Sequence, residues 1–184
     1  MLSCAGYMLR TVRRWAPILM LLCAVDPVAA HQTGNSYLYI RQVDGQLAVD
    51  LDFYLRDLGN LLQKPNARPE PAPPPEKIQA LQPDITEVIQ RSLKIEIDDR
   101  PVELAFSRQS IVLHNDGLYV RQQFVADAVA DNARFAVIRY GFFTQSDKLG
   151  RAFLRLTSGG DEISSVFDET TAIQRFALGD TKRS

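Results

Sequence analysis

Cysteine and histidine are both scarce in this chain of 184 residues. The two cysteines, Cys4 and Cys23, lie near the N-terminus, and the two histidines are His31 and His114. Beyond Cys23 there is no thiol, which excludes an internal disulfide, a cysteine nucleophile and a thiolate metal site from the rest of the chain. Two histidines so far apart in sequence also exclude the helix-spaced pair of a zinc enzyme. The fold must therefore be held together by an ordinary hydrophobic core.

Motifs for phosphate binding and for nucleophilic catalysis are missing as well. Gly159-Gly160 is an isolated pair and not part of a glycine-rich phosphate loop. No serine stands in the glycine-flanked elbow that joins a strand to a helix in serine hydrolases. Because no acid and base can be paired in the sequence, we expect a binding or assembly protein and not an enzyme.

Long apolar runs are limited to the N-terminal region. The run Trp15–Val25 has about 11 residues, whereas a membrane-spanning helix takes about 20. Three arginines precede this run and the small residues Val28-Ala29-Ala30 follow it, which is the order of a secretory signal peptide. We expect residues 1–30 to be cleaved after Ala30 and the mature protein to be periplasmic or secreted. Since all these features follow Met8, either Met1 or Met8 can be the start.

The mature chain would be weakly acidic. Cleavage removes three of the 21 basic and one of the 22 acidic side chains, which leaves a formal net charge of about −3. This balance gives no electrostatic reason to expect nucleic acid or an anionic membrane surface as the partner. The remaining length suits one domain with a sizeable core, which we expect over residues 31–180, followed by a tail over 181–184.

Alternating apolar and polar residues dominate the mature chain and predict antiparallel strands. The alternation from Leu47 to Arg56 is the clearest, and Ser36–Val43 is its expected partner across Asp44-Gly45. Two more hairpins are expected. The first pairs Lys94–Ile97 with Val102–Ser107 around the turn Asp98-Asp99-Arg100-Pro101. The second pairs Ser110–His114 with Leu118–Ala126 around the turn Asn115-Asp116-Gly117. Later strands are expected at Arg134–Tyr140, Ala152–Ser158 and Ile163–Phe167. Such spacing is typical of an antiparallel sandwich or barrel, and we expect a mainly β protein with an antiparallel β-sandwich.

One segment, Lys64–Glu76, is rich in proline and interrupts the alternation. Proline removes backbone donors and favours the polyproline conformation, so the segment predicts a solvated loop, with a ligand for a partner domain as the alternative. One short helix is expected after it, with Asp84 as its cap and Glu87 completing a capping box. The apolar face of this helix comprises Ile85, Val88, Ile89 and Leu93.

Cleavage after Ala30 would make His31 the first residue of the mature protein. Its amino group and imidazole would then form a chelate suited to copper or nickel. A second imidazole can come only from His114, so the candidate metal site is His31 with His114. His114 also adjoins a predicted turn, where a polar residue needs no special cause, and terminal residues such as His31 are commonly mobile.

The acidic residues Asp50, Asp52 and Asp57 form a second candidate site. Asp50 and Asp52 point the same way from one strand, so they could share a hard cation such as calcium with loop carbonyls. The alternative is that they belong to the solvated face of that strand.

Several segments carry a resemblance to a known family. The runs HQTGNSYLYI and LAVDLDFYLRDL resemble the extracytoplasmic N-terminal region of HupE/UreJ-type membrane proteins, which begins after signal cleavage with Ala-His and a Ser-Tyr-Leu strand. The runs SLKIEIDDRPVEL and IRYGFFTQSDKLGRAFLRL resemble its helix-to-strand passage and its closing hairpin. The resemblance covers most of residues 31–180 and implies a sensor or binding module.

This chain departs from the family pattern in two respects. Family members continue into a bundle of transmembrane helices associated with nickel uptake, whereas no apolar run of about 20 residues follows here, so transport is not implied. Relatives also carry a histidine near the position of Gly150 and an acidic insertion where this chain is proline-rich. Of the family's candidate metal residues, the resemblance leaves His31 and Asp57.

We therefore expect an exported accessory module that docks on an integral membrane protein through an exposed strand edge or through the proline-rich loop. The second expectation is a periplasmic protein that binds copper or nickel through His31.

Overall fold

The computed structural model of the chain describes residues 35–43, 45–62, 73–126, 130, 132–142 and 150–179. Four of the expectations fall outside these residues: the signal peptide, His31, positions 64–72 of the proline-rich segment and the 181–184 tail. Strands dominate the described part of the chain, as the alternation predicts.

The described residues contain ten strands and four helical segments. The strands are β1 (Ser36–Val43), β2 (Gln46–Tyr54), β3 (Leu93–Ile97), β4 (Arg100–Val102), β5 (Ala105–His114), β6 (Gly117–Ala126), β7 (Phe135–Tyr140), β8 (Ala152–Ser158), β9 (Asp161–Phe167) and β10 (Ile173–Ala177). The helical segments are the 3₁₀ turns η1 (Leu55–Asp57) and η2 (Pro75–Leu81) and the α-helices α2 (Leu58–Leu62) and α3 (Gln82–Ser92).

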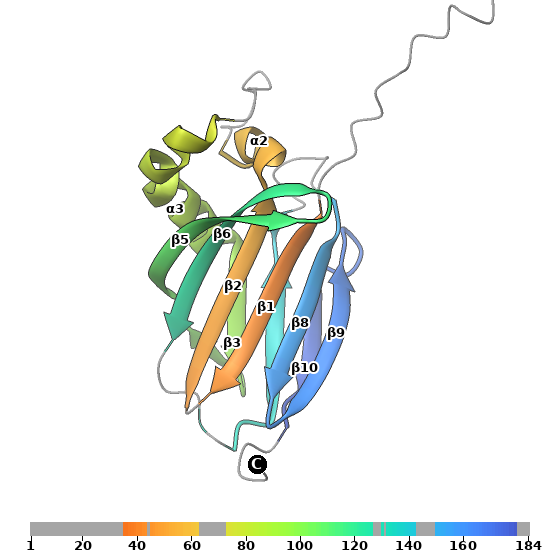
Figure 1. Cartoon of the computed structure of the whole chain (residues 1–184). Helices are drawn as coiled ribbons and strands as arrows, with labels where there is room; N and C mark the ends of the chain where they lie inside the picture. The colour runs from red at the N-terminus through yellow and green to blue at the C-terminus, as the bar shows by residue number, and fades with distance from the viewer. Residues whose placement is uncertain are drawn as a thin grey trace, which may run out of the picture. The chain divides into compact units, whose positions relative to one another are not determined.

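The strands form two sheets that enclose a common core, as in a β-sandwich (Figure 1). One sheet has six strands in the order β5-β6-β2-β1-β8-β9, and the other has four in the order β10-β7-β3-β4. Neighbouring strands run antiparallel except β1 and β8, which are parallel. The expected mainly β sandwich is thus confirmed. The parallel pair was not expected, because hairpin signals in a sequence report only neighbours along the chain.

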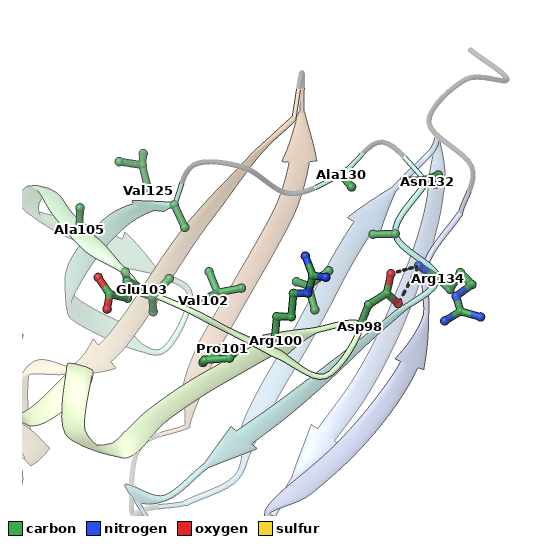
Figure 2. Close-up of a pocket in the computed structure, with 14 residues that line it drawn as sticks. Asp98, Arg100, Pro101, Val102, Glu103, Ala105, Val125, Ala130, Asn132 and Arg134 are labelled. Carbon is green, nitrogen blue, oxygen red and sulfur yellow. Dashed lines mark hydrogen bonds between the residues drawn. The ribbon is translucent and has the colours of Figure 1, made fainter.

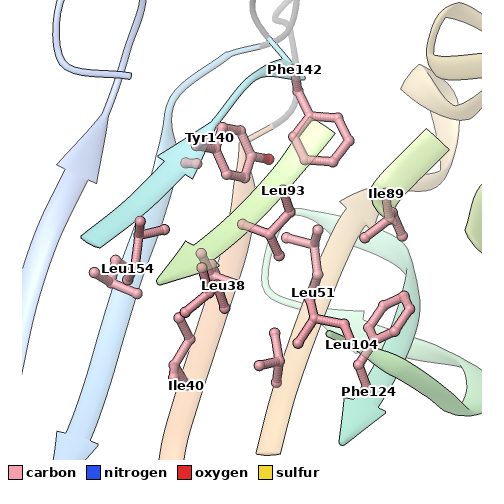
Figure 3. Packing of buried hydrophobic residues seen from close by; sticks show 14 of the residues in the cluster. Leu38, Ile40, Leu51, Ile89, Leu93, Leu104, Phe124, Tyr140, Phe142 and Leu154 are labelled. Carbon is pink, nitrogen blue, oxygen red and sulfur yellow. The ribbon is translucent and has the colours of Figure 1, made fainter. Parts of the chain in front are cut away.

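The core lies between the two sheets, where alternation buries every second residue of a strand. Leu38 of β1, Leu51 of β2 and Leu93 of β3 are each at most 2% exposed and pack with Tyr140 of β7 (Figure 3). The Tyr140 hydroxyl lies 2.6 Å from Ser36 Oγ, so its polar end is satisfied within the core. Each fully buried leucine contributes about 1.5–3 kcal/mol, so this layer supplies the stability that disulfides do not.

The helix α3 packs against the inner face of β5 and β6. Its Thr86 is buried and donates to the fully buried amide of Gln122 in β6 at 3.4 Å, and Gln122 in turn hydrogen-bonds Gln109 in β5. The predicted apolar face is buried as well, with Ile85 and Ile89 fully so. None of the helices in the described residues is long and apolar enough to cross a membrane.

The start of α3 differs from the prediction. The helix begins at Gln82, its N-cap residue is Leu81, and no side chain caps it, so the expected Asp84 cap is wrong. Pro83 lies in the first turn, where its fixed φ suits a helix start and its missing N–H costs nothing. Helical structure also extends back into the proline-rich segment, because η2 begins at Pro75.

Two of the predicted hairpins and the later strands agree with the structure within a few residues. The hairpin β1–β2 forms across the expected turn, although β2 ends at Tyr54 and the following residues enter η1. The hairpin β5–β6 forms across Asn115-Asp116, and Gly159-Gly160 joins β8 to β9. The strand β10 was missed.

The predicted strand Val102–Ser107 is wrong, because the chain changes sheets within it. Val102 ends β4 in the four-stranded sheet, and Ala105 begins β5 in the six-stranded sheet. The preceding turn is also shorter than predicted. Asp98 and Asp99 have φ of 47° and 63°, which fits a two-residue hairpin turn, so Arg100 and Pro101 belong to β4.

Candidate functional site

The outer face of the six-stranded sheet brings Asp52 and His114 together. Asp52 of β2 is fully buried although it points away from the core between the sheets. Its carboxylate accepts two hydrogen bonds of 2.6 Å from the guanidinium of Arg121 in β6, and Nε2 of His114 lies 2.8 Å from Oδ2. We call Asp52, His114 and Arg121 the carboxylate clamp.

A bent hairpin explains why Asp52 is buried on an outer face. The tip of β5–β6 runs across the upper ends of β2 and β1 (Figure 1), which carries His114 from the edge strand toward the middle of the sheet. The His114 ring stacks on Tyr37 of β1, with centroids 4.8 Å apart and planes at 6°, and meets Tyr119 edge-on at 4.5 Å. The carboxylate therefore lies at the Nε2 edge of the His114 ring and beside the guanidinium.

Within the clamp, the negative charge of Asp52 is paired with the positive charge of Arg121. The hydrogen bond from Arg121 to Asp52 raises the pKa of that guanidinium above its already high value. Burial, followed by the hydrogen bond that its hydroxyl donates to Asp116 at 2.8 Å, raises the pKa of Tyr119. Because three donors engage the Asp52 carboxylate, the clamp is built to hold the hairpin against the sheet.

The other two predicted acidic residues do not join the clamp. Asp50 lies two residues before Asp52 on the same face of β2. Its carboxylate accepts hydrogen bonds from Arg41 at 2.9 Å and from Gln123 at 3.0 Å. Asp57 lies in η1, beyond the end of β2. Asp50 and Asp52 thus point the same way as expected, but a cationic side chain already contacts each of them.

The metal prediction that combines His31 with His114 stays a prediction, because His31 lies outside the described residues. Within the described part of the chain, no three histidine, cysteine, aspartate or glutamate side chains are grouped to hold a metal ion. His114 also directs Nε2 at Asp52, so a metal at His114 would have to use Nδ1 or displace that contact.

A shallow hollow of about 310 Å³ lies beside the clamp on the same face. It is lined by three arginines, two acidic residues, a tyrosine and a threonine, namely Arg41, Arg121, Arg155, Asp50, Glu162, Tyr39 and Thr157. Each arginine has a carboxylate partner: Arg41 contacts Asp50, Arg121 contacts Asp52, and Arg155 contacts Glu162 at 3.3 Å. The arginines that line this hollow are therefore neutralised by neighbouring carboxylates.

A larger groove of about 880 Å³ opens where the edges of the two sheets separate (Figure 2). Its walls come from β4, which is terminal in the four-stranded sheet, from the start of β5, which is terminal in the six-stranded sheet, and from the end of β6. Apolar side chains from these strands and from the segment before β7 line it, including Ile97, Val102, Leu104, Val125 and Ala133. Arg100, Glu103 and Arg134 add charged groups to its lining (Figure 2).

Asp98 fixes one wall of the groove. Its carboxylate accepts hydrogen bonds from the backbone N–H groups of Arg134 and Phe135, at 3.1 and 3.2 Å. This contact ties the β3–β4 turn to the start of β7 (Figure 2), and both belong to the four-stranded sheet. The wall of the groove that the four-stranded sheet provides is thus anchored at this turn.

Neither Arg121 nor the groove was identified from the sequence. The alternation does place Arg121 on the outer face of β6, but its partner depends on the pairing of β2 with β6, which no turn signal reveals. The groove depends on the change of sheet between Val102 and Ala105, which the sequence pattern reads as one continuous strand.

No protein-family model and no curated protein matches this chain. The resemblance to the extracytoplasmic region of HupE/UreJ-type proteins therefore rests on its sequence motifs alone.

Proposed function

We propose that this protein is an exported binding module that takes up an extended segment of a partner protein in the groove between β4, β5 and β6. The partner would be an integral membrane protein, an expectation that comes from the sequence resemblance and from the predicted signal peptide. The groove carries the proposal, because it is the larger of the two concave sites described above and lies where both sheets end.

Edge strands are the places where a sheet can accept a further strand. Such strands leave backbone N–H and C=O groups without a neighbour in the sheet, and an added peptide pairs with them. The short β4, with Pro101 at its centre, offers few of these groups, whereas β5 has ten residues. We therefore assign backbone recognition to the start of β5 and side-chain recognition to the apolar lining.

The composition of the groove fits a peptide with apolar anchors. Val102 and Val125 present aliphatic surface, which an extended peptide can cover, whereas Ile97 and Leu104 are themselves buried. The charged groups of Arg100 and Glu103 can set the direction of the peptide through hydrogen bonds. Apolar groups with charged groups beside them are the common arrangement of a specific protein interface.

The test is capture from solubilised membranes by the full chain with a C-terminal tag. Ala105 is exposed at the start of β5 and lines the groove, so Ala105→Trp would place a bulky ring at the β5 end of the groove without disturbing the core. Ala80, which is exposed in η2 away from the groove, provides the matched control Ala80→Trp.

We expect the wild type and Ala80→Trp to retain the same integral membrane protein. Ala105→Trp should retain at least about tenfold less of it, because the introduced ring would remove contacts between the groove and the partner. Equal recovery by all three proteins, or recovery of no membrane protein by the wild type, would refute the proposal.

A further inference from the structure

Three basic side chains gather on the outer face of the four-stranded sheet. Lys94, Arg139 and Arg175 are exposed on this face, one from each of β3, β7 and β10. None of the three forms an ion pair within the described residues, whereas Arg41, Arg121 and Arg155 on the opposite face each have a carboxylate partner. We call Lys94, Arg139 and Arg175 the cationic row.

The strand register sets like charges against each other in this row. Lys94 of β3 lies directly opposite Arg139 of β7, and such a like-charged cross-strand pair destabilises a sheet. The next residue across from Arg139 is Ile173 of β10, which is 51% exposed and provides no counter-charge. Lys94 Nζ donates to the backbone carbonyl of Gln90 at 2.6 Å, so Arg139 is the cation of this pair whose donors an anion can reach.

Arg175 is held in place with its donors available. Its guanidinium carbon lies 3.5 Å from the centre of the Phe135 ring, so one face of the group is stacked on an aromatic side chain. The N–H groups of a stacked guanidinium point outward in its plane, where they can bind a carboxylate with two parallel hydrogen bonds. The guanidinium is thus pre-positioned, which lowers the entropy lost when a ligand binds.

Apolar residues lie between these cations on the same face. Val137 is directly opposite Arg175, and Ile173 is directly opposite Arg139. Glu96 is the acidic residue in register with Val137, on the far side of β7 from Arg175. Cations and aliphatic groups therefore alternate on β7 and β10, and a peptide with an acidic residue at every second position can direct all of its carboxylates toward this face.

We propose that the cationic row binds an acidic, extended segment of a partner protein, at a surface separate from the groove. Anionic lipid is the less favourable occupant, since three cations fall short of the clusters of about four to eight that recognise lipid headgroups. The segment would lie flat on β7, with its carboxylates directed at Arg139 and Arg175 and its intervening side chains pointing away from the sheet.

The test uses fluorescence anisotropy with a fluorescein-labelled decapeptide of alternating glutamate and valine as the probe. A decapeptide of alternating lysine and valine is the matched peptide control. The double variant Arg139→Gln/Arg175→Gln removes two exposed cations from this face, and Arg41→Gln/Arg155→Gln removes two from the opposite face with the same change in net charge. Circular dichroism establishes that both double variants are folded.

We expect the wild type to bind the glutamate peptide and not the lysine peptide, with affinity that falls as salt rises. Arg139→Gln/Arg175→Gln should weaken binding at least about tenfold, and the opposite-face variant less than about twofold. Equal weakening by both variants, or no binding of the glutamate peptide, would overturn the proposal. Tighter binding to vesicles of phosphatidylglycerol than to the peptide, lost in the same variant, would also overturn it by assigning the row to lipid.

Discussion

The imidazole Nε2 of His114, at the tip of the β5–β6 hairpin, lies 2.8 Å from the carboxylate of Asp52 in β2, which is fully buried. These two residues are 62 positions apart in the sequence. Their contact joins the edge of the six-stranded sheet to its middle. The carboxylate clamp is therefore a tertiary contact that holds a hairpin in a bent position.

Replacing Asp52 by asparagine should be strongly destabilising. The variant leaves Arg121 and His114 without their carboxylate, and removing one partner of a buried ion pair costs about 3–5 kcal/mol. Asp50→Asn is the matched control on the same strand and face, because Asp50 pairs with Arg41, whose side chain is 52% exposed. That pair should contribute at most about 1 kcal/mol. Urea unfolding of both variants tests this difference, and equal losses would contradict a special role for Asp52.

Replacing His114 by phenylalanine should separate the hydrogen bond from the ring stacking. Phenylalanine keeps an aromatic ring against Tyr37 and Tyr119 but leaves the Asp52 carboxylate one donor short, which should cost about 1–2 kcal/mol. The loss should be local, so hydrogen exchange should accelerate at the tip of β5–β6 and stay unchanged in β8. Uniform acceleration in all strands would show that His114 supports the whole sheet instead.

Alkaline pH should destabilise the fold through Tyr140. Burial raises the pKa of the Tyr140 hydroxyl above its ordinary value of 10, and the smaller effect of the Ser36 hydrogen bond acts in the opposite direction. Above pH 10 the unfolded chain therefore loses this proton while the folded chain keeps it, so stability is complete below pH 10 and falls as pH rises. The fall approaches about 1.4 kcal/mol per pH unit for one such group.

The measurement for Tyr140 is the free energy of unfolding between pH 8 and 11.5, compared with Tyr140→Phe. The variant should show a shallower decline above pH 10 although it loses the Ser36 hydrogen bond at every pH. Parallel curves for the two proteins would show that Tyr140 does not titrate on unfolding.

Copper binding, if it depends on the predicted mature N-terminus, should not need His114. The contact of His114 Nε2 with Asp52 already uses that nitrogen, so the chelate would consist of the amino group and imidazole of His31. Calorimetry with copper should therefore give the same affinity for the processed protein and its His114→Phe variant. One extra residue placed before His31 should abolish this binding, and unchanged affinity in that protein would remove the chelate from consideration.

Much of the fold could be predicted from the sequence because its signals are local. The alternation in β2 and the turns at Gly45 and at Asn115-Asp116 identify strands and hairpins from neighbouring residues alone. The break at Glu103-Leu104 could not be predicted, since leucine continues the apolar pattern while the backbone crosses to the other sheet. The parallel pairing of β1 with β8 depends on packing between distant segments and leaves no local trace.

The candidate site was predictable only in part for the same reason. Alternation correctly placed Asp50 and Asp52 on one face of β2, and the turn signal correctly placed His114 at a hairpin tip. Their contact partners follow from the order of strands and from the bend of the hairpin. A sequence pattern contains neither, so the pairing of Asp52 with His114 and Arg121 emerged only from the structure.

The central claim, that the groove between β4, β5 and β6 holds a segment of a membrane protein, is tested most directly by photo-crosslinking in intact cells. Benzoylphenylalanine at position 105, in the groove, should form an adduct with an integral membrane protein, and the same group at position 80 should not. An adduct at position 80 equal to that at position 105, or none at position 105 with the folded protein, would contradict the account.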